Sequence, residues 1–428
     1  MKARKALRAT VVAAALTATM PLVARAGDLT LDDYFAAALR RSEVVASQAE
    51  LIRQAEERYV QAKAAVRPRV DGVGAYTRTD TGARDASDFP TRQTLARLTA
   101  TQPLFRGFRE FAAIRQSQAL IGAQTGDYLN ARVQLFRDVV QNFYEVLALE
   151  QDLRNYAEQI GQNREREKEL QGRVRIGRSR IGEVLTVQST ISTLRARVEQ
   201  LRAELATARD VFAFLSGLPA ETPLLDIETL PARPAPLEEY LERVAARPDV
   251  KAAEGRFQAA QENVAVARGA RLPSVDLNAN RYLERDGTLE DVDWDVQLAL
   301  TVPLYAGGGL QSQLREALSQ STQAELDANR VRRLADQEIR SFHQIAVLDR
   351  SQLEALQRST DAARKNYETQ RRDYRLGLVT NLDVLQALTD FQENQRALDR
   401  ARYMAKLNYL RLEAAAVRRP ALPEADAR

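Results

Sequence analysis

The sequence predicts a mainly α-helical protein with a small β part, built from two tandem copies of one unit. Four short motifs recur in the same order at an offset of about 200 residues. Proline is absent over very long intervals, since 115 residues separate Pro103 from Pro219 and 116 separate Pro303 from Pro420. An average globular helix has only about 12 residues. The chain is therefore expected to be a duplication dominated by long helices.

The repeated motifs define the two units. They are Leu31-Asp-Asp-Tyr34 with Leu237-Glu-Glu-Tyr240, Val66-Arg-Pro68-Arg-Val70 with Arg271-Leu-Pro273-Ser-Val275, Thr101-Gln-Pro103-Leu-Phe105-Arg-Gly107 with Thr301-Val-Pro303-Leu-Tyr305-Ala-Gly307, and Gly177 plus Val184-Leu185 with Gly377 plus Val384-Leu385. We predict a first repeat over 27–218, a second over 237–417 and a tail over 418–428. Residues 219–236 contain five prolines and are predicted to form an extended linker.

Residues 1–26 have the features of a secretory signal peptide. Basic residues precede an uncharged apolar run, and Ala24-Arg25-Ala26 provides small residues for cleavage, which we expect after Ala26. A membrane anchor is the alternative, but the run is shorter than the ~20 residues that span a bilayer. No later segment approaches that length of uncharged apolar residues.

Composition and charge exclude several classes of protein. The chain has no Cys and one His, which excludes disulfides, a lipid anchor on Cys and the usual zinc sites, so no metal or cofactor is predicted. The formal charge is +4, but the signal segment holds five basic residues and no acidic ones. Without it, 57 basic and 58 acidic residues remain, so a nucleic-acid partner is not expected.

Each unit has the same order of predicted elements. A helix over 30–65 or 237–270 ends near a proline, two strands follow, and a Pro and Gly turn begins the long helical region. In the second unit no glycine interrupts residues 310–376, which predicts one helix about 100 Å long at ~1.5 Å per residue. Its apolar residues recur every three to four positions, and a second helix is expected to return after Gly377.

The predicted strands alternate apolar and polar residues. In the segment 293–302 one face carries Trp294, Val296, Leu298, Leu300 and Val302. The segment 274–283 alternates too, and 70–79 and 94–102 are weaker candidates. Such runs suit either a soluble sheet with one buried face or strands that cross a membrane. Four strands cannot close a barrel alone, so membrane strands would require several chains.

These features together resemble the TolC-like outer-membrane efflux family. The resemblance is carried by the paired motifs at 101–107 and 301–308 and by Tyr374-Arg-Leu-Gly377-Leu-Val-Thr-Asn-Leu-Asp383-Val-Leu-Gln-Ala387. It covers nearly the whole chain after the signal segment. It depends on the order, spacing and duplication of the motifs, because no single motif is decisive.

The resemblance implies a homotrimer whose chains each give four strands to a shared twelve-stranded outer-membrane β-barrel. The long helices would form a periplasmic α-barrel, and strand residues such as Trp294 would face outer-membrane lipid. The implied function is an exit duct for efflux or type I secretion, supplied by an inner-membrane pump and a periplasmic adaptor. Such a protein is not an enzyme.

The resemblance also assigns residues near the helix turns. Tyr374 matches a gate tyrosine, Asp383 an acidic pore ring and Glu183 a gate aspartate of the first repeat. The turns at Ile176-Gly177 and Leu376-Gly377-Leu378 would contact the adaptor. The simpler alternatives are that Asp383 caps a helix and that the glycines only reverse the chain.

Two positions depart from the family pattern. Val379 stands where a gate arginine is known, and Gln386 replaces a second acidic residue. Arg178 and Arg180 are candidates for the missing basic partners, or they are simply solvated turn residues.

Other classes of protein fit less well. Gly307-Gly-Gly309 lacks the Lys-Ser/Thr of a phosphate loop, and His343 has no metal or nucleophile motif around it. A periplasmic adaptor or another coiled-coil protein is the main alternative. An adaptor would be expected to carry one helical hairpin in a lipoyl-like domain, whereas this chain repeats a hairpin and a strand pair.

Overall fold

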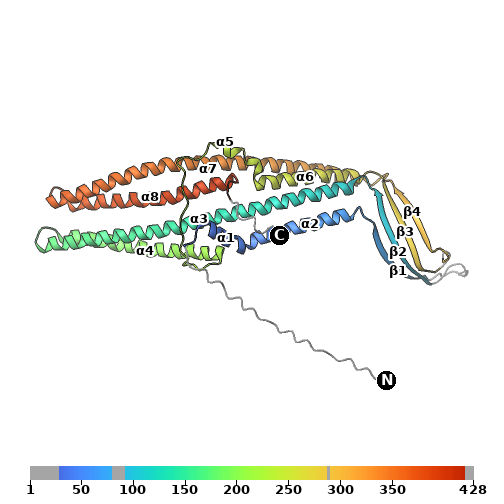
Figure 1. The fold of residues 1–428 in the computed structure, drawn as a ribbon, viewed down its shortest axis with the longest axis horizontal. Coiled ribbons are helices and arrows are strands. Elements are labelled where there is room, and N and C mark those ends of the chain that lie inside the picture. The colour runs from blue at the N-terminus through green and yellow to red at the C-terminus, as the bar shows by residue number, and fades with distance from the viewer. Residues whose placement is uncertain (1–27, 80–91, 287–289, 420–428) are drawn as a thin grey trace, which may run out of the picture.

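The computed structural model describes residues 28–79, 92–286 and 290–419, so the predicted signal peptide and most of the predicted tail lie outside the described residues. Figure 1 shows an elongated molecule in which long helices run side by side and a sheet projects from one end. The elements are α1 (Leu31–Arg41), α2 (Glu43–Ala64), β1 (Arg69–Arg78), β2 (Arg92–Phe105), α3 (Arg109–Arg175), α4 (Ile181–Ser216), α5 (Leu237–Leu241), the 3₁₀ helix η2 (Val244–Ala246), α6 (Pro248–Gly269), β3 (Ser274–Arg285), β4 (Trp294–Thr301), α7 (Gly309–Leu376) and α8 (Asn381–Ala415).

The same element order occurs twice, as predicted. The long helix expected over 310–376 is confirmed as α7, and α3 is its counterpart with 67 residues against 68. The linker runs across the helices between α4 and α5 (Figure 1). It is held to the start of the first repeat, where Leu29 N–H donates to Pro223 O at 2.8 Å. The exact repeat boundaries remain a prediction.

The first helix of each repeat is broken, which corrects the prediction of single helices over 30–65 and 237–270. Ser42 has an extended backbone and its side chain caps α2, accepting from Val45 N–H at 3.3 Å. In the second repeat, Arg247 is extended and Pro248 begins α6. A proline at the first helical position needs no hydrogen bond from its nitrogen, so it starts a helix rather than continuing one.

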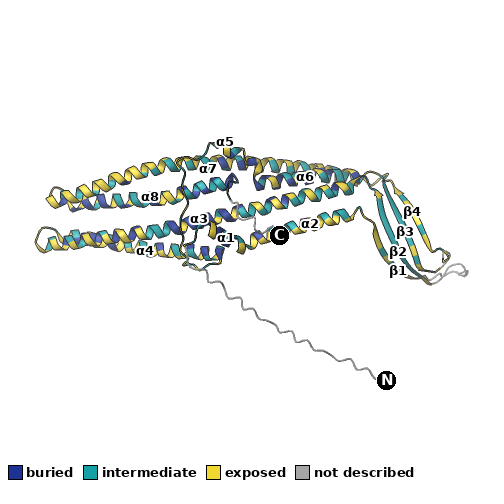
Figure 2. Cartoon of the chain, viewed as in Figure 1, coloured by how far each residue is buried: buried dark blue, intermediate teal, exposed yellow. Residues whose placement is uncertain are grey.

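The repeated tyrosines lie on α1 and α5, the short helices that precede these breaks. Tyr34 and Tyr240 are both fully buried, Tyr34 in an apolar cluster that also includes residues of α8 and Tyr240 in a cluster of the second repeat. Tyr34 also donates to Asn142 at 2.8 Å, and Asn142 donates to Ala208 O at 2.9 Å. Figure 2 shows buried residues concentrated around the middle of the long axis, whereas the strands are exposed or half-buried. The short helices thus act as central packing elements.

The four strands form one antiparallel sheet in the order β1-β2-β3-β4. The predicted strands are confirmed, but β2 extends at both ends beyond 94–102, and β4 ends at Thr301, so Val302 lies just beyond it. A register shift between Ala96 and Arg97 marks a bulge against β3. Among the described residues, β1 and β4 each pair on one side only.

Two different seams join the repeats along α3. Near the sheet, α3 packs against α6 through glycine and alanine. A Cβ added at Gly126 would lie 2.7 Å from Pro248 O and 2.9 Å from the Ala252 Cβ, and one added at Gly255 would lie 3.1 Å from Ala119 O. Toward the turns, α3 lies beside α8 instead. None of the described helices combines the length and apolar character needed to cross a bilayer.

Candidate functional site

The two helix turns at the far end from the sheet have the same backbone geometry. Gly177 and Gly377 both have positive φ, at 72° and 78°. Arg178 N–H donates to Arg173 O at 2.8 Å, and Leu378 N–H donates to Asp373 O at 3.0 Å. These bonds satisfy the last carbonyls of α3 and α7 in the way that a left-handed glycine permits. The turns predicted from the repeated glycines are therefore where the chain reverses.

The turns present apolar side chains to solvent. Ile176, Leu376 and Leu378 are 65%, 69% and 71% exposed. The structure adds three exposed apolar residues near the starts of the returning helices, namely Ile181, Leu185 and Leu382, which the sequence had not assigned to this contact surface. Exposed apolar groups clustered at one end of a protein are typical of a surface that contacts a partner.

Asp383 caps the returning helix of the second repeat. Thr380 N–H and the Thr380 hydroxyl both donate to its carboxylate, at 2.8 and 2.6 Å, and Asp383 N–H donates back to the Thr380 hydroxyl at 3.4 Å. The hydrogen bond from the Thr380 side chain, together with the backbone bonds, lowers the pKa of Asp383 from its ordinary value. The capping interpretation therefore has direct geometric support, and the pore-ring role remains a prediction.

The first-repeat candidates lie at the matching turn. The Ser179 hydroxyl donates to the Glu183 carboxylate at 2.6 Å, close to the first turn of α4. Arg178 and Arg180 are exposed and form no ion pair with any described residue. Arg178 and Arg180 were predicted to replace a missing gate arginine. No contact among the described residues supports that prediction.

Tyr374 instead meets two other arginines, from α3. Tyr374 is 8% exposed, and the guanidinium carbons of Arg166 and Arg173 lie 4.1 and 4.4 Å from the centroid of its ring. Arg166 also donates to the Asn381 side-chain oxygen from Nε at 2.9 Å and from Nη2 at 2.6 Å. Arg166 therefore joins the first hairpin to both helices of the second.

Sequence reasoning missed Arg166, although a weak signal existed. Arg166, Glu169 and Arg173 are spaced by three and four residues on one helix, so they share a face with Leu170, which is fully buried. Arg166 Nη1 pairs with Glu169 at 2.7 Å. Val379, the residue in place of the family arginine, packs against the apolar cluster around Tyr374. The basic groups that contact Tyr374 thus come from the opposite hairpin.

More polar contacts follow between α3 and α8. Asn155 donates to Asp399 at 3.1 Å, and Gln392 donates to Gln162 at 2.8 Å. Arg396 also contacts Tyr156, with its guanidinium carbon 4.6 Å from the ring centroid. With Arg166 and Asn381, these pairs form what we call the polar seam, defined by Asn155–Asp399, Tyr156–Arg396, Gln162–Gln392 and Arg166–Asn381.

The sheet has one apolar and one polar face. The predicted lipid-facing residues Trp294, Val296, Leu298 and Leu300 are 65%, 56%, 64% and 65% exposed, and Val302 beyond the strand is 47% exposed. The opposite face is hydrogen-bonded across strands, with Thr99 donating to Asn280 at 2.8 Å and Tyr282 to Asp295 at 2.7 Å. A soluble sheet would bury its apolar face, but no described element covers this one.

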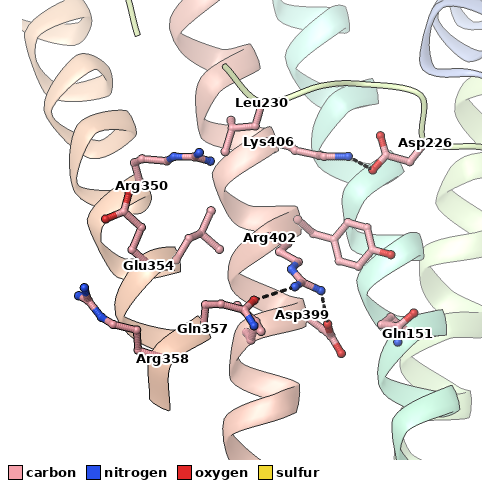
Figure 3. A pocket seen from close by; sticks show the side chains of 13 residues that line it. Gln151, Asp226, Leu230, Arg350, Glu354, Gln357, Arg358, Asp399, Arg402 and Lys406 are labelled. Carbon is pink, nitrogen blue, oxygen red and sulfur yellow. Dashed lines mark hydrogen bonds and ion pairs between the residues drawn. The ribbon is translucent and has the colours of Figure 1, made fainter. Parts of the chain in front are cut away.

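A cavity of about 770 Å³ lies between α7, α8 and the linker. Figure 3 shows Lys406 directed toward Asp226 and Arg402 toward Asp399, and these pairs are 2.6 and 3.1 Å apart. Among the described residues no cluster of acidic, His or Cys side chains has the arrangement of a metal site. His343 contacts Ala235 O at 2.9 Å and packs against Tyr240, which is a structural role.

A model of the outer membrane efflux protein family matches residues 35–218 and 242–416, which is most of the chain and falls in both repeats. The chain belongs to the outer membrane efflux protein family. The predicted family is therefore confirmed.

Curated relatives and solved structures agree with this. The chain is 26% identical to the outer membrane efflux protein BepC of Brucella suis over 93% of this chain and 88% of BepC, and 23% identical to TolC of Escherichia coli over 84% of this chain and 76% of TolC. Its fold is similar to CusC, with a TM-score of 0.82 at 19% identity over 90% of this chain and 91% of that one. It is also similar to VceC of Vibrio cholerae, with a TM-score of 0.80 at 19% identity over 90% of this chain and 95% of VceC. The predicted fold class is confirmed by these neighbours.

Proposed function

We propose that this chain is one protomer of a trimeric outer-membrane exit duct. Family membership carries this proposal, and the sheet supports it. Within the described ranges, β1 and β4 are unpaired on their outer edges and the apolar face of the sheet is uncovered. Backbone groups cannot be left unpaired in lipid, so the edges require strands from other copies. Three copies would supply the twelve strands of a closed barrel, with Trp294 and its neighbours facing lipid.

The helices would continue the duct into the periplasm, after a signal peptide has been removed at Ala26. At ~1.5 Å per residue, α3 and α7 are each about 100 Å long, which suits a periplasmic conduit. The exposed apolar residues at the turns, including Ile176, Leu376 and Leu378, would contact a periplasmic adaptor, which connects the duct to an inner-membrane pump. The chain itself performs no catalysis in this role.

The turn end of the duct is proposed to be its gate. The contacts of Arg166 and Arg173 with Tyr374, and of Arg166 with Asn381, hold the two hairpins of one chain together near the turns. Glu183 and Asp383 would line the narrow end, where three copies of a carboxylate would favour cations. Arg178 and Arg180 are free to meet those carboxylates from other copies.

Membrane fractionation and conductance test this function. We expect the full-length protein to be found in the sarkosyl-insoluble outer-membrane fraction, to have the mass of a trimer by light scattering in detergent, and to conduct ions in planar bilayers. A soluble periplasmic monomer without conductance would exclude the duct and favour a coiled-coil adaptor or structural protein.

A further inference from the structure

Arg350 on α7 carries a charge that no described residue neutralises. It forms no hydrogen bond or ion pair with any described residue, and its Nε is buried away from solvent without an acceptor. Buried nitrogens of this kind are normally hydrogen-bonded, because leaving one without an acceptor costs its lost hydration. Arg350 is therefore a candidate for an anionic partner from outside the chain.

The first repeat shows how the equivalent position is satisfied by an ion pair. The long helices of the two repeats start 200 residues apart, and so do the returning helices. Arg350 therefore corresponds to Glu150, whose carboxylate pairs with Arg209 of α4. The residue that corresponds to Arg209 is Tyr409 on α8. In the second repeat the acid is thus an arginine and its basic partner a tyrosine, so the cation has no counterpart on the returning helix.

Arg350 points into the cavity of about 770 Å³ between α7, α8 and the linker. Figure 3 shows its side chain directed toward Leu230 of the linker, on the side where Lys406 also lies. Cavities of roughly 300–1,000 Å³ are the size that drug-sized ligands occupy in proteins. The unpaired guanidinium group therefore faces a space large enough for a small organic molecule.

Part of the cavity wall is apolar. Its apolar lining consists of Leu230, Leu353, Leu398 and Tyr403. These residues come from the linker, α7 and α8, so three segments that are distant in sequence share the lining. An aliphatic or aromatic group placed against them would leave water, which favours its binding.

The charged lining favours an anion. Two of its basic residues, Arg402 and Lys406, already pair with the aspartates of the cavity at 3.1 and 2.6 Å. Glu354 and Arg358 are exposed, and Figure 3 shows them directed away from α8. Within the described chain, the unpaired charge that faces this cavity is thus the cation of Arg350. A guanidinium group can bind a carboxylate or phosphate through two parallel hydrogen bonds.

We infer that this cavity binds an amphipathic organic anion. Its carboxylate or phosphate group pairs with Arg350, and its apolar body lies against Leu230 and Leu353. Because Leu230 belongs to the linker, the bound molecule holds the linker against α7. The site lies within a single chain and uses neither the sheet nor the helix turns, so it is separate from the proposed duct.

Calorimetric titration of the full-length protein in detergent tests this site, with 3-phenylpropionate as the probe. This probe carries one carboxylate on an apolar body. Its neutral amide, 3-phenylpropionamide, has the same shape without the charge, and acetate has the charge without the body. We expect saturable binding of 3-phenylpropionate and about tenfold weaker binding of the amide, because a hydrogen bond to a charged group is stronger than one between neutral groups. Acetate should also bind more weakly, since it buries no ring.

Substitutions at the cavity assign the binding to its residues. Arg350→Met removes the charge and keeps an unbranched side chain, so it should weaken 3-phenylpropionate about tenfold and leave the amide unchanged. Arg358→Met is the matched control on the same helix, and it should change the affinity less than about twofold because Arg358 is exposed. Leu353→Ala should weaken 3-phenylpropionate and the amide but not acetate.

Several results would overturn the inference. They are no saturable binding of 3-phenylpropionate, equal binding of the acid and the amide, and equal affinity of the native protein and Arg350→Met. The comparison of acid and amide uses the native protein, so it tests the site even if a variant fails to fold. If the probe does not bind and Arg350→Met lowers the temperature at which oligomers dissociate, the anion is a carboxylate of another copy and the ligand site does not exist.

Discussion

The two halves of α3 meet the second repeat through very different surfaces. Near the sheet, Gly126 and Gly255 allow α3 and α6 to approach so closely that an added Cβ would contact backbone atoms of the other helix. Toward the turns, α3 meets α8 through the polar seam of hydrogen bonds and arginine contacts. One helix therefore has a close-packed half and a half in which polar pairs lie beside the apolar cluster around Tyr374.

This difference indicates where the molecule can rearrange. A seam of small residues depends on a fixed distance between backbones, and shifting it would lose dispersion contacts along its whole length. A polar seam can exchange partners with water or other side chains at lower cost, because each hydrogen bond contributes only about 1 kcal/mol net. Movement is expected at the turn end, while the sheet end keeps its geometry.

The largest predicted effect comes from filling the close-packed half. Gly126→Leu should destabilise the protein by about 3 kcal/mol, since the new side chain must displace Pro248 and Ala252. Gly122→Leu is the matched control on the same helix, because a Cβ there meets nothing within 4 Å. The control should gain up to about 1 kcal/mol from helix propensity. Thermal unfolding followed by circular dichroism measures both, and equal unfolding temperatures would contradict the close-packed seam.

Replacing Arg166, whose guanidinium group joins the two hairpins near the turns, should have the next largest effect. Arg166→Ala leaves the buried Asn381 oxygen without the guanidinium, at a cost of about 2 kcal/mol to the contact between hairpins. Because this contact holds the proposed gate, single-channel conductance in planar bilayers should increase. Arg164→Ala is the control, since Arg164 is exposed on the same helix and pairs with no described residue. Unchanged conductance in Arg166→Ala would exclude this link from gating.

A smaller effect is expected from two substitutions that distinguish the contribution of the Tyr374 ring from that of its hydroxyl group. The ring receives Arg166 and Arg173, while the hydroxyl forms no hydrogen bond with a described residue. Tyr374→Phe should therefore leave conductance and stability nearly unchanged. Tyr374→Leu should lose about 1 kcal/mol of cation–π interaction and open the gate more often. If Tyr374→Phe were as conductive as Tyr374→Leu, the hydroxyl would be the important group.

The sequence was a better guide to the fold than to the site. Motif repetition and proline-free intervals predict the duplicated order, the long α7 and the turns at Gly177 and Gly377, because these depend on local backbone preferences. The break at Ser42 was missed because a single serine in a helical pattern does not show that its side chain will cap a new helix. Arg166 was missed because its role depends on a contact with Asn381, 215 residues away, that no local pattern records.

The smallest predicted effect concerns Asp383, whose carboxylate caps α8. Its folded pKa lies below the ordinary value of about 4, so the cap is intact above that pH and is lost as pH falls through the lower folded value. Asp383→Asn should mimic the acid state at neutral pH and increase hydrogen exchange of residues 381–384 only.

Asp33→Asn is the control, because Thr30 and Asp33 form the same capping box on α1 at the middle of the molecule. Both variants should loosen one helix turn, but only Asp383→Asn should also alter cation selectivity in bilayers, because only Asp383 lies at the proposed gate. Equal selectivity in the two variants would mean that Asp383 is a cap and nothing more.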